Sequence, residues 1–268
     1  MSAARPAPPL ALKPGGTAPI GFGRTVRRDR WWLYPAVQGT LFTICAAYLF
    51  VSGVIWTPLF NTAYEVDGYL SPLFSPLILL PFLPSWFSPA ILILWVPLGF
   101  RATCYYYRKA YYRFYFVDPP GCGVAEPTIH KSYAMETAFP FILQNVHRYF
   151  LYLAFIPLTF LWLDAVIAFV RPEGLRIGFG GALFLVNVTL LSGYSLSCHS
   201  LRHIVGGRLD CFSCSRTRRI RHGLWQRLTS LNRHHMAWAW TSLISVSLAD
   251  LYVRLLALGV LADPAIRL

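Results

Sequence analysis

Long, uninterrupted runs of apolar residues dominate the pattern of this chain. Five runs reach the roughly 20 residues that a helix needs to cross the apolar core of a bilayer. They cover about residues 31–55, 90–107, 147–170, 179–202 and 235–261. Because the apolar positions do not form the one-sided stripe of a soluble helix, the sequence predicts an all-α fold. We expect a polytopic membrane protein whose five transmembrane helices form a bundle.

Composition strengthens this prediction. Of 268 residues, 56% are hydrophobic and only 13% are charged, with a mean hydropathy of +0.48; a soluble domain carries about a quarter of charged residues. The net charge of +13 is also typical of nucleic-acid-binding proteins. Here, however, the basic residues flank the apolar runs, as orientation in a membrane requires. We therefore predict the lipid bilayer as a partner and exclude nucleic acid.

The remaining segments set the domain boundaries. Residues 1–23 are rich in Pro, Gly and Ala and lack the apolar core of a cleavable signal, so we interpret them as a flexible cytoplasmic tail. Residues 24–268 form the membrane domain. Within it, the prolines of residues 69–89 argue against one straight helix. This stretch is predicted to be an outer loop or a re-entrant, interfacial segment.

The basic residues also predict the orientation. With the N-terminus inside, every lysine and arginine falls on the inner side except Arg171, Arg176, Arg254 and Arg267. Because cytoplasmic loops carry the excess of Lys and Arg, the N-terminus is predicted to be cytoplasmic and the C-terminus outside. The predicted location is the cell membrane, crossed several times.

On this topology, all seven histidines and all cysteines but Cys45 lie at the inner side. A reducing compartment does not favour structural disulfides, so the clustering suggests a cytoplasmic-side metal or redox centre. His199 and His203 share a helix face at i and i+4, which lets both imidazoles reach one metal ion. Cys198 precedes them, and Cys104 ends the second span at a similar depth. Polar helix ends without any cofactor are the alternative.

Two redox centres fit this inventory. A pair of stacked haems is excluded because no histidine lies in the outer half, whereas a single haem b between His147 and His203 stays open. Two cysteines with two histidines would instead suit a Rieske-type [2Fe–2S] cluster. The pair Cys211 and Cys214 forms a lone CxxC without the partner pair of a zinc site, so we interpret it as incidental.

Charged residues inside the predicted spans are a separate feature. Asp164, Asp250 and Arg254 lie toward the outer side, and Asp250 and Arg254 can pair directly at i and i+4. Ionisable residues are costly in a membrane and often functional. The alternatives are a structural ion pair and a proton path or quinone pocket.

Several segments resemble one known family. They are Arg28-Asp29-Arg30-Trp31-Trp32, the stretch from Tyr69 to Pro76, the tyrosine-rich block from Cys104 to Arg113, the stretch from Gln144 to Phe150, Ser197-Cys198-His199, and Arg233-His234-His235-Met236. From about residue 20 onward, the chain is similar to the single-chain membrane anchor of actinobacterial succinate dehydrogenase.

The resemblance implies a function. The anchor would hold a flavoprotein subunit and an iron–sulfur subunit at the cytoplasmic face and pass electrons from succinate to menaquinone. It would belong to an enzyme without having activity alone. The alternatives are a transporter, for which no internal repeat is evident, and a cofactor-free structural anchor.

The resemblance also implies a Rieske-type [2Fe–2S] cluster in place of haem. The candidate ligands are Cys104, Cys122, Cys198, His199 and His203, with His147 and His235 in reserve. A ring and a cationic donor suit a quinone headgroup. The candidate quinone-binding residues are Arg30, Trp31, Trp32 and His235.

Overall fold

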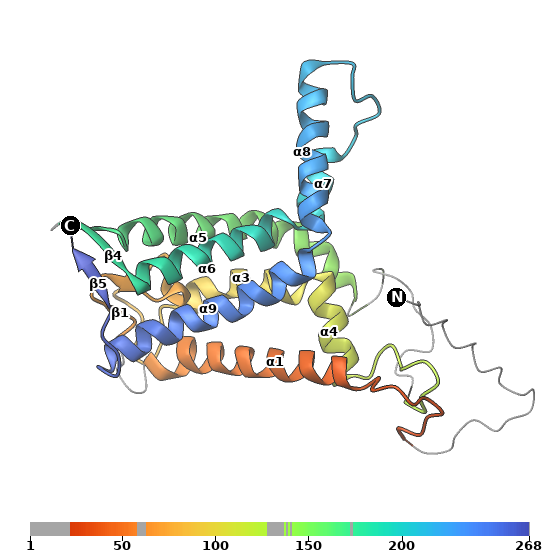
Figure 1. Cartoon of the computed structure of the whole chain (residues 1–268), viewed down its shortest axis with the longest axis horizontal. Coiled ribbons are helices and arrows are strands. Elements are labelled where there is room, and N and C mark those ends of the chain that lie inside the picture. The colour runs from red at the N-terminus through yellow and green to blue at the C-terminus, as the bar shows by residue number, and fades with distance from the viewer. Residues whose placement is uncertain are drawn as a thin grey trace, which may run out of the picture. The chain divides into compact units, whose positions relative to one another are not determined.

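The computed structural model describes residues 22–57, 63–127, 137, 139, 141–171 and 174–267. They divide into two compact units. The first comprises the described parts of residues 1–39 and 110–133, and the second those of 40–109 and 134–268. The second unit contains most of the helical bundle drawn in Figure 1.

Helices make up most of the described chain, as predicted. They are α1 (Leu33–Phe50), α3 (Ile91–Ala102), α4 (Tyr105–Tyr115), α5 (His147–Ile167), α6 (Phe179–Leu196), α7 (His199–Gly206), α8 (Arg216–Asn232) and α9 (His235–Ala257). A π-helix over Val51–Trp56 continues α1, and 3-10 turns cover Pro72–Phe74 and Phe141–Val146.

Four helical segments of the described chain are long and apolar enough to cross a membrane: Leu33–Trp56, Ile142–Ile167, Phe179–Leu196 and His235–Ala257. They match the first, third, fourth and fifth predicted spans. The second predicted span, 90–107, is interrupted: α3 ends at Ala102 after 12 residues, and α4 begins at Tyr105. At 1.5 Å per residue α3 is about 18 Å long, less than the roughly 30 Å of a bilayer core.

The bundle helices of the second unit alternate in direction along the chain. α5 packs against α3 and α6, and α6 packs against α9. The ends of α3 and α6 therefore meet the beginnings of α5 and α9 at one end of the bundle. The predicted fourth span, 179–202, also breaks there, because α6 ends at Leu196 and α7 begins at His199. α7 and α8 run crosswise to the bundle helices (Figure 1).

Short strands of two to five residues lie at the opposite end of the bundle, in a chain that is otherwise mostly helical. β1 (Glu65–Val66) pairs with β2 (Tyr69–Leu70), and β4 (Gly174–Gly178) pairs with both β3 (Val170–Arg171) and β5 (Ala265–Arg267), all antiparallel. Apart from the 3-10 turn over Pro72–Phe74, the Pro-rich stretch that follows β2 is not helical. Its beginning is buried in the bundle at Leu73 and Phe74, whereas its later part is exposed, as at Leu79, Phe82 and Trp86.

Asp263 ties this end of the bundle together. Its carboxylate accepts hydrogen bonds from the Tyr69 hydroxyl at 2.7 Å, the Tyr252 hydroxyl at 2.6 Å and the Gly180 amide at 3.0 Å. Arg176 adds an ion pair at 3.0 Å. Although burial raises the pKa of Asp263, the hydrogen bonds and the Arg176 charge outweigh it and hold the pKa below its usual value. The strands are therefore fastened to α6 and α9.

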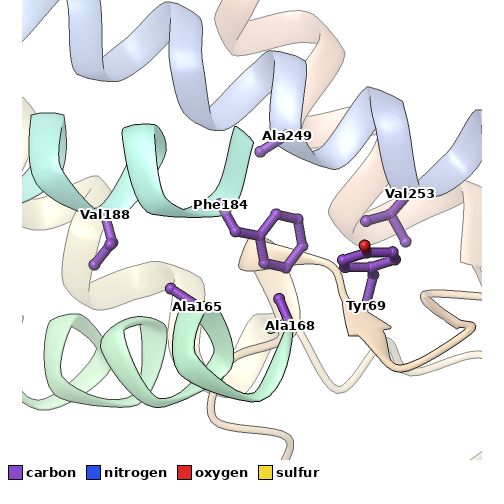
Figure 2. Close-up of a cluster of buried hydrophobic side chains, with 7 residues drawn as sticks. All are labelled: Tyr69, Ala165, Ala168, Phe184, Val188, Ala249 and Val253. Carbon is purple, nitrogen blue, oxygen red and sulfur yellow. The ribbon is translucent and has the colours of Figure 1, made fainter. Parts of the chain in front are cut away.

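A small apolar core fills the space between α5, α6 and α9 near the strands. Figure 2 shows Phe184 reaching from α6 toward Tyr69 and Ala168, and the rings of Phe184 and Tyr69 meet edge to face at 5.5 Å. Alanines at 165, 168 and 249 let the helices approach closely. Small residues at helix contacts are typical of membrane bundles, where lipid gives no apolar driving force between helices.

The predicted pairing of Asp250 with Arg254 is confirmed, at 3.6 Å between Arg254 Nε and Asp250 Oδ1. Both side chains are almost fully buried. Asp250 also accepts hydrogen bonds from the hydroxyls of Tyr48, Ser52 and Ser71. The pair thus joins α9 to α1 and to the segment after β2. Asp164 lies apart on α5, and its Oδ2 has no hydrogen-bond partner among the described residues.

The first unit is small. Arg24 and Gly23 exchange backbone hydrogen bonds with Ala125, at 2.8 Å each, and Thr25 forms a bridge with Val124. Arg113 pairs with Glu126 at 2.8 Å. These contacts join the segment before α1 to the loop after α4.

Candidate functional site

Two buried cysteines occupy matching positions in the second unit. Cys104 lies between the end of α3 and the beginning of α4, and Cys198 lies between the end of α6 and the beginning of α7. Each is only 1% exposed. Each also follows a hydroxyl residue, Thr103 and Ser197 respectively. The chain therefore presents the same hydroxyl–cysteine pair twice at one end of the bundle.

Two histidines meet these cysteines from the beginnings of the neighbouring helices. His147 begins α5 and places Nε2 3.3 Å from Cys198 Sγ. His235 begins α9 and places Nε2 3.6 Å from Cys104 Sγ. His235 is 2% exposed, and His147 is partly buried. Helix packing thus brings residues that are far apart in the sequence together as two thiol–imidazole pairs.

The hydroxyl residues hold the two rings from behind, in a crossed arrangement. Thr103 Oγ1 lies 2.9 Å from His147 Nδ1, and Ser197 Oγ lies 2.7 Å from His235 Nδ1. Thr103 therefore orients the histidine that faces Cys198, and Ser197 orients the histidine that faces Cys104. The hydroxyl residue next to each cysteine thus orients the histidine that faces the other cysteine.

The hydrogen-bond pattern also favours one tautomer of each ring. The Thr103 hydroxyl donates its single proton to the Gly99 carbonyl at 2.7 Å, and the Ser197 hydroxyl donates to the Tyr194 carbonyl at 3.0 Å. Each hydroxyl oxygen can then only accept from Nδ1–H. A neutral imidazole with its proton on Nδ1 has a lone pair on Nε2. Both histidines thus direct a metal-binding lone pair at a cysteine sulfur.

The four side chains form one cluster. Phe100 stacks on His147, Tyr194 stacks on His235, and the Phe100 and Tyr194 rings lie 5.1 Å apart, so the two thiol–imidazole pairs are neighbours. No three metal-ligating side chains of the described chain surround a single point. Thiolate and imidazole groups are ligands both of zinc and of iron–sulfur centres, so the four side chains can serve as metal ligands.

Aromatic and cationic side chains surround the cluster. Phe100 stacks on His147 at 4.7 Å, and Tyr194 stacks on His235 at 5.1 Å. Arg101 lies over the Tyr194 ring at 4.8 Å and donates hydrogen bonds to the Tyr107 hydroxyl and the Ser242 hydroxyl. Aromatic rings therefore pack against both histidines, and the Arg101 guanidinium lies nearby.

The other predicted metal ligands lie elsewhere. His199 and His203 do share a face of α7, with ring centroids 5.1 Å apart, but both are exposed, whereas Cys104 and Cys198 are buried. The break between α6 and α7 directs them away from the spanning helix. Cys122 belongs to the first unit and is exposed, and its carbonyl accepts a hydrogen bond from Arg27.

The candidate quinone-binding residues do not gather in one unit. Arg30, Trp31 and Trp32 lie in the first unit, where Trp31 packs beneath the Arg113 guanidinium at 5.8 Å and Trp32 is 53% exposed. His235 lies in the second unit, where both of its ring nitrogens have partners. A quinone role for Arg30, Trp31, Trp32 and His235 stays a prediction.

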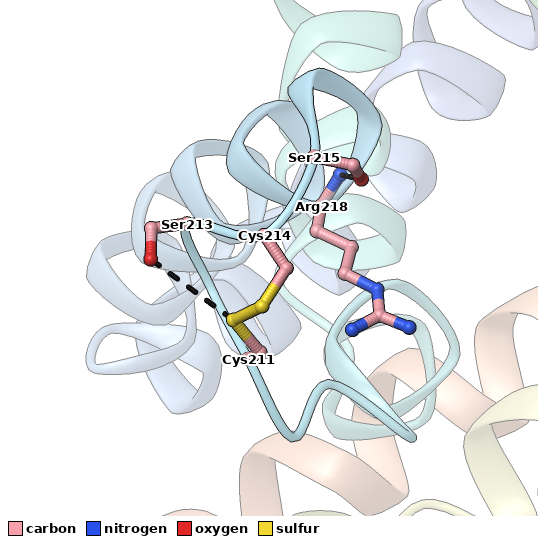
Figure 3. The surroundings of a disulfide bond; sticks show 5 residues. All are labelled: Cys211, Ser213, Cys214, Ser215 and Arg218. Atoms are coloured by element: carbon pink, nitrogen blue, oxygen red, sulfur yellow. Dashed lines mark hydrogen bonds between the residues drawn. A yellow bond between two sulfur atoms is a disulfide. The ribbon is translucent and has the colours of Figure 1, made fainter.

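The CxxC pair, interpreted as incidental, is a disulfide between Cys211 and Cys214. It lies in the loop before α8 (Figure 3), where the neighbouring Ser215 side chain caps the helix by accepting from the Arg218 amide. Neither cysteine takes part in the buried cluster. This disulfide differs from the expectation of reduced thiols in cytoplasmic loops.

Comparisons with known proteins agree with this architecture. The family model described as actinobacterial succinate dehydrogenase subunit SdhC matches residues 38–259. A chain of the Mycobacterium smegmatis Sdh1 complex in the apo form is similar, with a TM-score of 0.79 and 38% sequence identity over 92% of this chain and 95% of that chain. No curated protein sequence matches. The chain belongs to the actinobacterial SdhC family and is a multi-pass membrane anchor subunit of succinate dehydrogenase.

Proposed function

We propose that Cys104, Cys198, His147 and His235 hold a Rieske-type [2Fe–2S] cluster. This set replaces the sequence-based candidates Cys122, His199 and His203 and takes both reserve histidines. The observation that carries the proposal is the crossed arrangement of two buried thiols, each facing an imidazole Nε2 lone pair. A Rieske-type centre needs two cysteines and two histidines, which is the composition of the site.

The side chains of the site suit metal binding in three ways. Thr103 and Ser197 fix the tautomer and orientation of the histidines, as outer partners of metal ligands do. The thiols would lose their protons when metal binds, since the thiolate is the ligand. Cys104, Cys198 and His235 are almost fully buried, and the burial of a bound centre affects its reduction potential.

When bound, such a cluster supplies one-electron transfer. Oxidation of succinate to fumarate releases two electrons and two protons. Reduction of menaquinone to menaquinol takes up two of each, so the anchor would pass two single electrons per turnover. We propose that the flavoprotein and iron–sulfur subunits dock at the cluster end of the bundle, because electrons must enter the membrane there.

We also propose that five segments cross the membrane, with the N-terminus cytoplasmic. α3 is too short alone, but the non-helical chain before it is buried at Ser88 and Ala90, and Ser88 donates a hydrogen bond to the Gly53 carbonyl. Non-helical backbone at membrane depth is tolerated when it is buried in protein. The arginines of α8 and Arg101, Arg108 and Arg202 lie at the cluster end, which supports the cytoplasmic assignment of that end.

Spectroscopy of the whole complex tests the proposal. We would purify the complex containing this chain and record low-temperature EPR beside the optical difference spectrum and the contents of iron and acid-labile sulfide. We expect a reduced [2Fe–2S] signal of low average g value beyond the signals of the iron–sulfur subunit, and no haem b band. A haem b band without that signal would favour haem. The absence of both the additional [2Fe–2S] signal and the haem b band would favour an anchor without a cofactor.

The hydroxyl residues behind the histidines give a first mutational prediction. Thr103→Val and Ser197→Ala remove the acceptors of the Nδ1 protons, so each histidine loses its fixed orientation. We expect the content of the additional cluster, measured by EPR spin counting, to fall by roughly 10–100-fold, as for other outer partners of metal ligands.

Thr189→Val is the matched control for Thr103→Val. Thr189 makes the same hydrogen bond to the carbonyl four residues earlier, Leu185, but contacts no histidine. Equal cluster loss in the control and in Thr103→Val would show that the effect comes from the helix and not from the imidazole.

A further inference from the structure

We propose that Tyr194 donates a hydrogen bond from its hydroxyl to the Cys104 sulfur and thereby raises the reduction potential of the centre. This inference rests on the proposed cluster and assigns a further role to a residue that is not a ligand. Tyr194 is a positioning residue on α6, one turn before Cys198. It would influence electron transfer through the sulfur that it contacts.

The Tyr194 hydroxyl is a buried polar group whose hydrogen-bonding capacity is not used by the described residues. The side chain is only 2% exposed, and its hydroxyl has no hydrogen-bond partner among the described residues. Leaving a buried donor unsatisfied costs about 1–3 kcal/mol. Such a group is expected only where a further partner offsets the cost.

The packing of the ring determines where this hydroxyl lies. His235 stacks on the ring at 5.1 Å with an interplanar angle of 24°, and Phe100 packs against it at 5.1 Å. Arg101 lies over the ring at 4.8 Å. His235 in turn places Nε2 3.6 Å from Cys104 Sγ, so the Tyr194 ring packs beside this thiol–imidazole pair, and the hydroxyl is close enough to Cys104 for the two groups to influence each other electrostatically. Tyr194 therefore packs its ring on one proposed ligand, His235, and we infer that its hydroxyl points toward the sulfur of another, Cys104.

The neighbouring Tyr107 differs from Tyr194 in that its hydroxyl proton already has an acceptor. The Tyr107 hydroxyl donates to the Ala239 carbonyl at 2.5 Å and accepts from Arg101, so it has no proton left for a sulfur. Its side chain is equally buried, at 1% exposed. The two tyrosines thus form a matched pair, of which only one has a free donor.

The electrostatic consequence follows from the charge change on reduction. A metal-bound cysteine is a thiolate, and a buried O–H donor to an anionic acceptor is a strong hydrogen bond. Reduction adds one electron to the centre and makes its sulfurs more negative, so the bond strengthens in the reduced state. Hydrogen bonds to the sulfurs are among the factors that set the potentials of such clusters, and this one shifts the potential upward.

Redox titration of the EPR signal in the purified complex tests the inference. We expect Tyr194→Phe to keep the signal, because the ring and its stacking remain, but to shift its midpoint potential downward. The matched variant Tyr107→Phe should leave the potential near the wild-type value. An unchanged potential in Tyr194→Phe, or an equal shift in both variants, overturns the role of the hydroxyl.

A second substitution covers the case in which Tyr194→Phe does not assemble. Site-specific 3-fluorotyrosine at position 194 keeps the ring and the hydroxyl but makes the phenol more acidic, and hence a stronger donor. We expect the midpoint potential to move upward, and no change or a downward move would contradict the proposal. Absence of the signal from the wild-type complex would instead refute the proposed cluster, so the two failures are distinguishable.

Discussion

Replacing either His147 or His235 by Ala is expected to abolish the additional [2Fe–2S] signal of the complex. Each substitution removes an Nε2 lone pair that faces a buried cysteine. Because a metal ligand itself is lost, the effect on succinate-dependent menaquinone reduction should exceed the ~10–100-fold loss typical of outer partners. EPR and quinone reduction by the purified complex measure both quantities. Oxidation of succinate with a soluble dye should persist, because in the proposed complex the flavoprotein subunit carries out that step.

His199→Ala and His203→Ala are the controls for this prediction. Both histidines are exposed on α7, so the signal and quinone reduction should remain close to wild type. Cys122→Ser, in the first unit, is expected to behave in the same way. If a histidine on α7 proves essential and His147 does not, the ligand assignment is wrong.

Asp250→Ala is expected to cause the largest loss of stability. The substitution leaves the Arg254 guanidinium, which is 1% exposed, without its counter-charge and removes the acceptor for three hydroxyls. Breaking a buried ion pair on one side costs about 3–5 kcal/mol. Thermal unfolding of the purified complex should show a clear decrease in melting temperature.

A double replacement separates charge from packing. With Asp250→Leu and Arg254→Met together, no unpaired charge is left, and apolar replacement of a buried pair is often neutral or stabilising. We expect the double variant to be more stable than Asp250→Ala alone. Residues 235 and 250 lie about 22 Å apart along α9 at 1.5 Å per residue, so the EPR signal should be unchanged. A melting temperature of Asp250→Ala equal to wild type would contradict a stabilising role for the pair.

The sequence predicts the apolar helices well, because each span is a run of residues that only a membrane or a core can bury. The breaks inside the runs are harder to predict. Thr103 and Ser197 end α3 and α6 within continuous apolar stretches, and neither Pro nor Gly stands at the break. Here tertiary contacts decide: each hydroxyl binds a backbone carbonyl and a histidine from another helix.

The same breaks explain why the sequence favours His199 and His203 over His147 and His235. Spacing of i and i+4 shows only that two residues share a helix face, and it does not show what that face meets. His147 and His235 are 88 residues apart in the chain and meet only when α5 and α9 begin at the same end of the bundle. Two signals were present: both begin a predicted span, and the hydroxyl–cysteine pair occurs twice, at 103–104 and 197–198.

The most direct test of the central claim is the detection of nitrogen ligands on the reduced cluster. Pulsed EPR of the complex, with natural-abundance and ¹⁵N-labelled histidine compared, resolves nitrogen nuclei bound to iron. Ligation by His147 and His235 predicts two strong histidine nitrogen couplings that persist in the His199→Ala and His203→Ala variants. A cluster without histidine couplings, or couplings that disappear when His199 or His203 is replaced, would contradict the account.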